Sequence, residues 1–441
     1  MIGGDVLIAD MKMRHSNKTG SSMLFCAVDN SKDQSSNTTK GQNDQIDDSS
    51  SKLPYFSILN LLIKACIASD PFLLGEVFRS GYVTIIIFAV LIFLLTELSF
   101  FTFVQSWIYG RAYSFNSIWA EVFGKKSCPW IMLVLVLLIY FSYVVWYQYE
   151  FYDYLAIFIT QFWPDAPSIL TNQYFLNYLV AGVIIIPTLF VKKLTNFYIM
   201  SYVSNFCLIL GLICLIAHYI HYVKYEGISF KATVEESDLQ TFPSSIYTAV
   251  ETIGTINSAL FFFPILPIAI ADLDRPTRSR TMSLTWTVSA LSVIIHFIGG
   301  FFAYLLNPES EGDNIFFELS PYNEDRSEII YPEIIIGQVA TYLTSIFTTI
   351  FYTYYISRLL AELIFPQSTK STVSVVFSGI TLSLLAIGLN FLDEVVTSVA
   401  DLIAGVLSCF LSYAVPPFLY FCQYRFSNKL LGISSLLLLI V

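Results

Sequence analysis

A carboxylate stands beside a proline inside the first apolar stretch of the chain. Asp70 and Pro71 follow Ala68 and Ser69 in a run that begins near residue 58. Proline removes a backbone donor and clashes with the preceding turn, so we expect the helix to break between Ala68 and Pro71. A carboxylate there could bind a substrate amine, a cation or a proton, because acids placed inside a membrane are usually functional. The alternatives are that Asp70 pairs with Lys64 or caps the broken helix.

A second interruption is expected in the apolar run from 246 to 271. Pro264 and Pro267 follow three phenylalanines there, and this sixth run lies five after the first, as in two five-helix repeats. Unwound backbone is tolerated inside a membrane only where it is buried in protein or lines a cavity. Paired interruptions therefore point to a transporter's substrate site, with two unrelated proline kinks as the alternative. The predicted substrate-binding residues are Ala68, Ser69, Asp70, Phe263 and Pro264.

Other apolar runs carry groups that could hold an ion. A carboxyl in a low-dielectric site can carry a proton, and we expect Asp70 and Glu251 to do so. For Glu97 and Asp401 the preferred interpretation is a neutral, hydrogen-bonded buried acid or a group near the membrane interface. Hydroxyl oxygens in the eighth run are hard ligands suited to sodium, although threonines in membrane helices often bond their own backbone. The predicted ion-coupling residues are Asp70, Glu251, Ser345, Thr348 and Thr349.

The composition requires a membrane to receive these runs. Of 441 residues, 55% are hydrophobic and only 13% are charged, about half the charge of a soluble chain. Eleven apolar segments follow a polar start, and most have the length that crosses a bilayer. We expect an all-α polytopic membrane protein, with segments near 58–78, 83–107, 130–152, 174–191, 197–223, 246–271, 283–306, 332–360, 372–391, 395–421 and 430–441.

Loop charges set the expected orientation. With a cytosolic N-terminus, twelve Lys and Arg residues fall in inside loops and four in outside loops, as the positive-inside rule requires. Residues 1–53 are rich in Ser, Asn, Asp, Lys and Gln, a composition typical of disorder. The predicted organisation is therefore a disordered cytosolic tail over 1–53 and a transmembrane transporter domain over 54–441.

Several short motifs, in the same order along the chain, resemble the amino acid/auxin permease family. They are Asn60 through Lys64-Ala-Cys-Ile-Ala-Ser-Asp70 with Gly81, Tyr109-Gly110, Glu121-Val-Phe-Gly124, Pro187 with Lys192-Lys193-Leu194, Leu266-Pro-Ile268, Asp272-Leu-Asp-Arg-Pro276, Asn314-Ile-Phe-Phe-Glu-Leu319 and Pro416-Pro-Phe-Leu-Tyr420. The resemblance covers about residues 55 to 425. It implies amino acid transport by a leucine-transporter-type core with five plus five helices in inverted repeats and with helices 1 and 6 broken.

Departures from that family bear on the site. Ala68 and Asp70 replace both glycines of its Gly-x-Gly motif, where glycine lets backbone amides approach a substrate carboxylate. Thr349 lies nine residues before Arg358. In the sodium-coupled neutral amino acid transporters, which this region resembles, a threonine nine residues before an arginine contributes to the sodium site. The two prolines that those transporters place between them are Phe351 and Ile356 here.

The function expected from these features is secondary active transport of amino acids or related small amines by alternating access, coupled to H⁺ or Na⁺. The alternative is a non-transporting nutrient sensor or scaffold of the same fold, whose midplane cavity would be filled by Phe261, Phe262 and Phe263. The expected membrane is the plasma membrane or an endolysosomal or vacuolar membrane.

Other function classes have no supporting pattern. No phosphate-binding glycine loop and no basic tract for nucleic acid occurs. Cysteine and histidine spacings match no metal site, and His218 and His221 are interpreted as a surface pair. His296 has no acid a turn away, so we expect no enzyme, no catalytic residue and no cofactor beyond a coupling ion. The expected partners are the substrate and the lipid bilayer.

Overall fold

The computed structural model describes residues 52–68, 70–72, 74–75, 77–78, 81–110, 115–191, 194–226, 241–243, 245–308, 314–322, 329–365, 372–389 and 406–424. These residues belong to one compact unit, Lys52–Val441. The predicted tail lies outside them except for residues 52 and 53, so its disorder and its boundary stay predictions.

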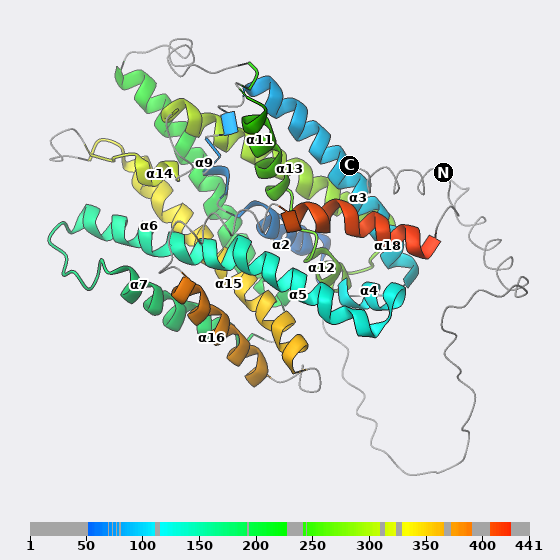
Figure 1. Ribbon diagram of the computed structural model, residues 1–441. Coiled ribbons are helices and arrows are strands. Elements are labelled where there is room, and N and C mark those ends of the chain that lie inside the picture. The colour runs from blue at the N-terminus through cyan, green and yellow to red at the C-terminus, as the bar shows by residue number, and fades with distance from the viewer. Residues whose placement is uncertain are drawn as a thin grey trace, which may run out of the picture. The chain divides into compact units, whose positions relative to one another are not determined.

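Helices make up nearly all of the described chain (Figure 1). Strand pairing among the described residues is limited to the isolated bridges Leu53–Leu273 and Tyr322–Ile329. The principal helices are α2 (Tyr55–Ile67), α3 (Tyr82–Gly110), α4 (Phe115–Phe123), α5 (Cys128–Ile139), α6 (Trp146–Phe162), α7 (Gln173–Val180), α8 (Ile186–Thr188), α9 (Tyr198–Glu226), α11 (Ile246–Ser258), α12 (Leu266–Ala271), α13 (Arg278–Leu306), α14 (Ile315–Glu318), α15 (Pro332–Ile364), α16 (Thr372–Leu389) and α18 (Val415–Tyr424). Single 3₁₀ turns form η1 (Asp70–Phe72), η3 (Lys125–Ser127) and η6 (Leu194–Phe197), and π-helical stretches form η4 (Tyr140–Val145), η5 (Ala181–Ile185) and η8 (Phe410–Ala414).

Six helical segments of the described part are long and apolar enough to cross a bilayer. They are Tyr82–Ser106, Lys125–Val145, Tyr198–Tyr225, Arg278–Leu306, Pro332–Ile364 and Thr372–Leu389, and shorter apolar helices lie at Tyr55–Ile67, Tyr174–Thr188 and Val406–Cys422. Exposed apolar side chains such as Ile86, Val90 and Leu94 along α3 are suited to lipid contact. The expectation of an all-α integral membrane protein is confirmed.

The predicted segments coincide with these helices with few exceptions. The third helix extends to Phe162 instead of ending near 152, because α5, η4 and α6 follow one another without a break. The tenth segment is described only from 406, and the segment 430–441 lies outside the described residues. The first ten predicted segments are otherwise represented in order.

Several helices have a proline in their first turn, where proline is tolerated. Pro129 and Pro332 lie in the first turns of α5 and α15, where the missing N–H has no helical partner to lose. Other helix starts are capped by side chains. Asn172 accepts from the amides of Tyr174 and Phe175, both at 3.1 Å, at the start of α7.

The first interrupted helix, α2, packs mainly against α13 and α9, and α11 packs against α3. α15 lies along α9 and α16, while α13 contacts α2, α3, α9 and η1 (Figure 1). Glycines allow the segment after α2 to approach α13 closely. A Cβ at Gly299 would lie 2.6 Å from the carbonyl oxygen of Pro71, and one at Gly300 would lie 2.9 Å from that of Leu74.

A short backbone pairing also joins the two interrupted helices at one end. The Leu53 amide donates to the Asp272 carbonyl at 2.8 Å, and the Asp274 amide donates to the Leu53 carbonyl at 2.9 Å. The residues before α2 are thereby bonded through their backbone to the residues after α12.

Candidate functional site

Both predicted interruptions are present. α2 ends at Ile67, and Ala68 takes a φ of 46° and a ψ of −134° before η1 begins at Asp70. The second helix stops at Ser258 and resumes as α12 at Leu266. Pro264 lies inside this second interruption, whereas Pro267 lies in the first turn of α12 and helps to start it.

The two interruptions lie against each other. The Cys66 thiol donates to the carbonyl oxygen of Ala259 at 3.3 Å, so the last turn of α2 touches the end of α11. Ala68 and Pro264 are both buried. The structure therefore places the last turn of α2 against the end of α11, next to the two interruptions.

Tyrosines satisfy carbonyl groups that the interruptions release. The Tyr143 hydroxyl donates to the Phe261 carbonyl at 3.4 Å, and the Tyr355 hydroxyl donates to the Pro264 carbonyl at 2.9 Å. The Tyr352 hydroxyl donates to the Ala65 carbonyl. The rings of Tyr143 and Tyr352 stack at 3.9 Å. Side chains of η4 and α15 are thus bonded to both broken helices.

The phenylalanines before Pro264 contact α3. The Phe262 ring lies 4.6 Å from Phe100, and the Phe263 ring lies 4.4 Å from Phe103. These rings pack on α3, which is the second membrane segment. The midplane cavity expected for a transporter lies between the first, third, sixth and eighth segments. The contacts do not match the filling of that cavity expected for a sensor.

Lys64 is a site residue that the sequence interpretation did not select. It is 2% exposed, and its ammonium donates to the Thr344 carbonyl at 3.0 Å and to the Thr348 hydroxyl. The available signal was a lysine inside an apolar run, which is uncommon in membrane helices. The contacts with Thr344 and Thr348 connect residues 280 or more positions apart and could not be read from local spacing.

The predicted ion-binding hydroxyls lie together on α15, where all three side chains are buried. Besides accepting from Lys64, the Thr348 hydroxyl donates to the Thr344 carbonyl at 2.8 Å. The Thr349 hydroxyl donates to the Ser345 carbonyl at 3.1 Å. A sodium ion at the Thr348 oxygen would lie beside the Lys64 ammonium, whose charge would repel it.

Three predicted site groups cannot be placed. Ser69 lies outside the described residues, and so do the side chains of Asp70 and Glu251. Asp401 lies outside them as well. The His296 Nδ1 lies 3.1 Å from the Ser292 hydroxyl and 2.8 Å from the Ser292 carbonyl oxygen. Within the described residues no cluster of three or more His, Cys, Asp or Glu side chains is arranged to hold a metal.

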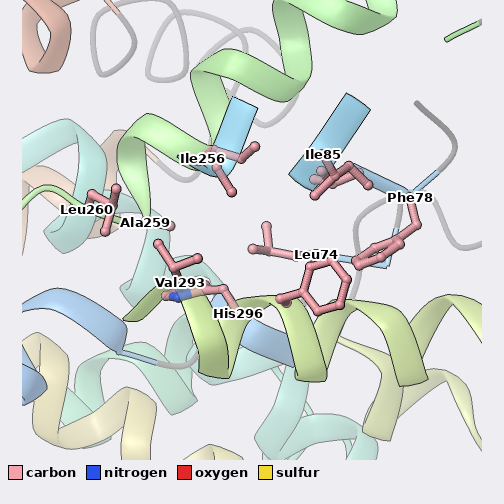
Figure 2. Close-up of a pocket in the computed structure, with 11 residues that line it drawn as sticks. Leu74, Phe78, Ile85, Ile256, Ala259, Leu260, Val293 and His296 are labelled. Carbon is pink, nitrogen blue, oxygen red and sulfur yellow. The ribbon is translucent and has the colours of Figure 1, made fainter. Parts of the chain in front are cut away.

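An apolar cavity of about 40 Å³ adjoins both interruptions (Figure 2). Leu74 and Phe78 follow the first interruption, Ile256 and Ala259 end α11, and His296 belongs to α13; Figure 2 shows these side chains around one space. The volume exceeds the minimum that one water molecule needs.

Comparisons with solved structures identify the fold. A Na⁺-coupled sialic acid symporter in a substrate-bound outward-open state aligns with a TM-score of 0.54 and 15% identity, over 88% of this chain and 88% of that chain. MhsT in complex with L-phenylalanine aligns with a TM-score of 0.52 and 14% identity, over 87% of this chain and 97% of that one. The chain has the leucine-transporter type of fold. No protein-family model and no curated protein sequence matches it.

This fold explains why helices 1 and 6 are the broken ones. The predicted leucine-transporter-type core is confirmed, and the interruptions of α2 and of α11–α12 occupy the first and sixth membrane segments. At these identities the comparisons establish fold alone. The substrate and the ion must be argued from this chain's own residues.

Proposed function

We propose that the protein is a secondary active transporter of amino acids or related small amines, working by alternating access. The observation that carries the proposal is the contact between two broken helices, in which Cys66 of α2 bonds the Ala259 carbonyl at the end of α11. Interrupted helices at matching positions of two repeats form substrate sites in transporters. The substrate would bind along the backbone from Ala68 to Asp70 and at Phe263 and Pro264.

The substrate class is supported by two further observations. The motifs from Asn60 to Tyr420 resemble the amino acid/auxin permease family, and we propose membership of that family on their order. One protein of the same fold, MhsT, was solved with L-phenylalanine and another is a sialic acid symporter. An amino acid carries an amine that a carboxylate at Asp70 would attract. The proposal includes no enzymatic activity.

The coupling ion proposed is H⁺ rather than Na⁺. The Lys64 ammonium bonds two oxygens on α15, the Thr344 carbonyl and the Thr348 hydroxyl, which are hard ligands of the kind that sodium prefers. A fixed positive charge at that point repels a second cation.

We propose a cytosolic N-terminus, which an accessibility assay on an N-terminal epitope would check. We also propose residence in the plasma membrane or an endolysosomal or vacuolar membrane.

The test is uptake of a labelled amino-acid panel into proteoliposomes with an imposed pH or sodium gradient. Wild type, Asp70→Asn and a control, Asp165→Asn, are compared, because Asp165 is exposed in the connection after α6. We expect gradient-driven uptake by wild type and the control and its loss in Asp70→Asn. If the folded wild type takes up no member of the panel under either gradient, the transporter proposal fails and the sensor alternative replaces it.

A further inference from the structure

One face of α13 carries buried polar side chains from Thr281 to His296. Its side chains recur every three or four residues, a spacing that places them on one side of a helix. All are at most 5% exposed. They are Thr281, Thr285, Ser289, Ser292 and His296.

Two hydroxyls of this face contact the carboxyl group of Glu97 on α3. Glu97 is 4% exposed. Its Oε1 accepts a hydrogen bond from the Ser289 hydroxyl at 2.7 Å, and its Oε2 lies 3.2 Å from the Thr285 hydroxyl. Among the described side chains, the partners of the Glu97 carboxyl are these two hydroxyls, and no ion pair within 4.0 Å involves it.

Several titratable groups lie on the elements packed against this part of α3. Arg278, two helical turns from Thr285 on α13, donates to the Gln105 side-chain oxygen at 2.7 Å in the amide orientation that satisfies both groups. His296, two turns from Ser289 in the other direction, bonds Ser292. The remaining titratable side chains on elements packed against α3 include Tyr413 of η8, which bonds Thr96, Tyr420 of α18, Glu121 of α4 and Glu251 of α11, whose side chain is not among the described ones.

A buried carboxylate without a counter-ion is unfavourable, and such a group takes up a proton instead. Hydroxyl donors lower this penalty without removing it. The Glu97 site is therefore suited to a carboxyl group that binds a proton and can release it again.

Thr285 allows both states without leaving a polar atom unpaired. Its oxygen lies 3.2 Å from Glu97 Oε2 and 3.0 Å from the Met282 carbonyl oxygen, and a hydroxyl has one hydrogen and two lone pairs. When Glu97 is a carboxylate, the Thr285 hydrogen points at it. When Glu97 is protonated, its O–H donates to Thr285, whose own hydrogen turns to Met282.

The same face of α13 is bonded to the second interruption. Ser292, one turn beyond Ser289, donates to the Ala259 carbonyl at 2.7 Å. Ala259 also accepts from Cys66 at the end of α2. A change in the packing of α3 on α13 would therefore reach both broken helices through one carbonyl group.

We propose that Glu97 is a proton-binding site of this protein, and that its loading and release accompany rearrangement of the broken helices. The role in coupling rests on the proposed transport function, whereas proton binding does not. Glu97 is a positioning residue in this scheme, because it acts on the substrate site through α13.

Infrared difference spectroscopy on the reconstituted full chain tests proton binding directly. A carboxylic-acid C=O band that changes with pH and shifts in D₂O is expected in wild type and in the control Glu333→Gln, and is expected to be lost in Glu97→Gln. Thr285→Val keeps the Glu97 carboxyl but removes the hydroxyl that pairs with it in both protonation states. This variant should therefore move the pH midpoint of that band. A band that is unchanged in Glu97→Gln would overturn the proposal whether or not the protein transports.

Transport provides the second measurement. With the membrane potential clamped and the outside one pH unit more acidic than the inside, substrate accumulates up to about tenfold if one proton moves with it. The ratio of accumulation with and without the gradient should fall to one in Glu97→Gln and keep the wild-type value in Glu333→Gln. A gradient-dependent ratio equal to that of wild type in Glu97→Gln would overturn the role in coupling while leaving the transport proposal intact.

Discussion

Replacing Gly299 by alanine should displace the segment after α2 and lower both stability and transport. The added Cβ would lie 2.6 Å from the Pro71 carbonyl oxygen and 2.8 Å from the Pro71 Cβ, whereas ordinary contact begins at 3.4 Å. Pro71 must therefore move by about 0.8 Å, or α13 must tilt. Overpacking of this kind costs about 1–3 kcal/mol, and the better helix propensity of alanine returns at most about 1 kcal/mol.

The assay compares thermal unfolding and initial uptake rates of Gly299→Ala with those of a matched control. A Cβ at Gly182 meets nothing within 4 Å, so Gly182→Ala should leave stability and uptake unchanged or raise stability slightly. We expect a net loss of up to about 2 kcal/mol for Gly299→Ala and slower uptake, because Pro71 adjoins the first interruption. If both variants unfold and transport alike, the close packing of this segment on α13 does not govern the site.

Four further outcomes are expected. Replacing sodium by choline should leave wild-type uptake unchanged, and sodium-dependent uptake would contradict H⁺ coupling. Lys64→Met should slow uptake about tenfold or more, because a charged hydrogen bond contributes about 1.5–3 kcal/mol. Ala68→Gly should raise the unfolding temperature, since a φ of 46° is strained for alanine by about 1–2 kcal/mol, and an unchanged midpoint would refute that strain. Tyr352→Phe removes the donor to Ala65 and should cost about 1–3 kcal/mol in chemical or thermal unfolding, with the exposed Tyr178→Phe unaffected.

The interruptions were predictable because proline acts locally. Pro71 placed the first one correctly between Ala68 and itself. Pro264 placed the second, although Pro267 begins α12 instead of breaking a helix. The third helix was predicted too short, because Glu150 and Asp153 end the apolar run while the backbone continues as a helix to Phe162.

The side-chain contacts at the site were not predictable in the same way. Lys64 meets Thr344 and Thr348, and Tyr355 meets Pro264, across long separations in the chain. No spacing rule identifies such partners, because they depend on how whole helices pack. The polar face of α13 could have been found from the spacing of its hydroxyl residues, whereas its partner Glu97 on α3 could not.

The most direct test of transport is substrate counterflow, which needs no knowledge of the coupling ion. Proteoliposomes are preloaded with one unlabelled amino acid from the panel, and entry of the same labelled amino acid is followed without any ion gradient. Alternating access predicts a transient accumulation of label above the outside concentration in preloaded vesicles and none in empty vesicles. Equal entry of label into preloaded and empty vesicles, for every amino acid tested and with the protein folded, would contradict the account.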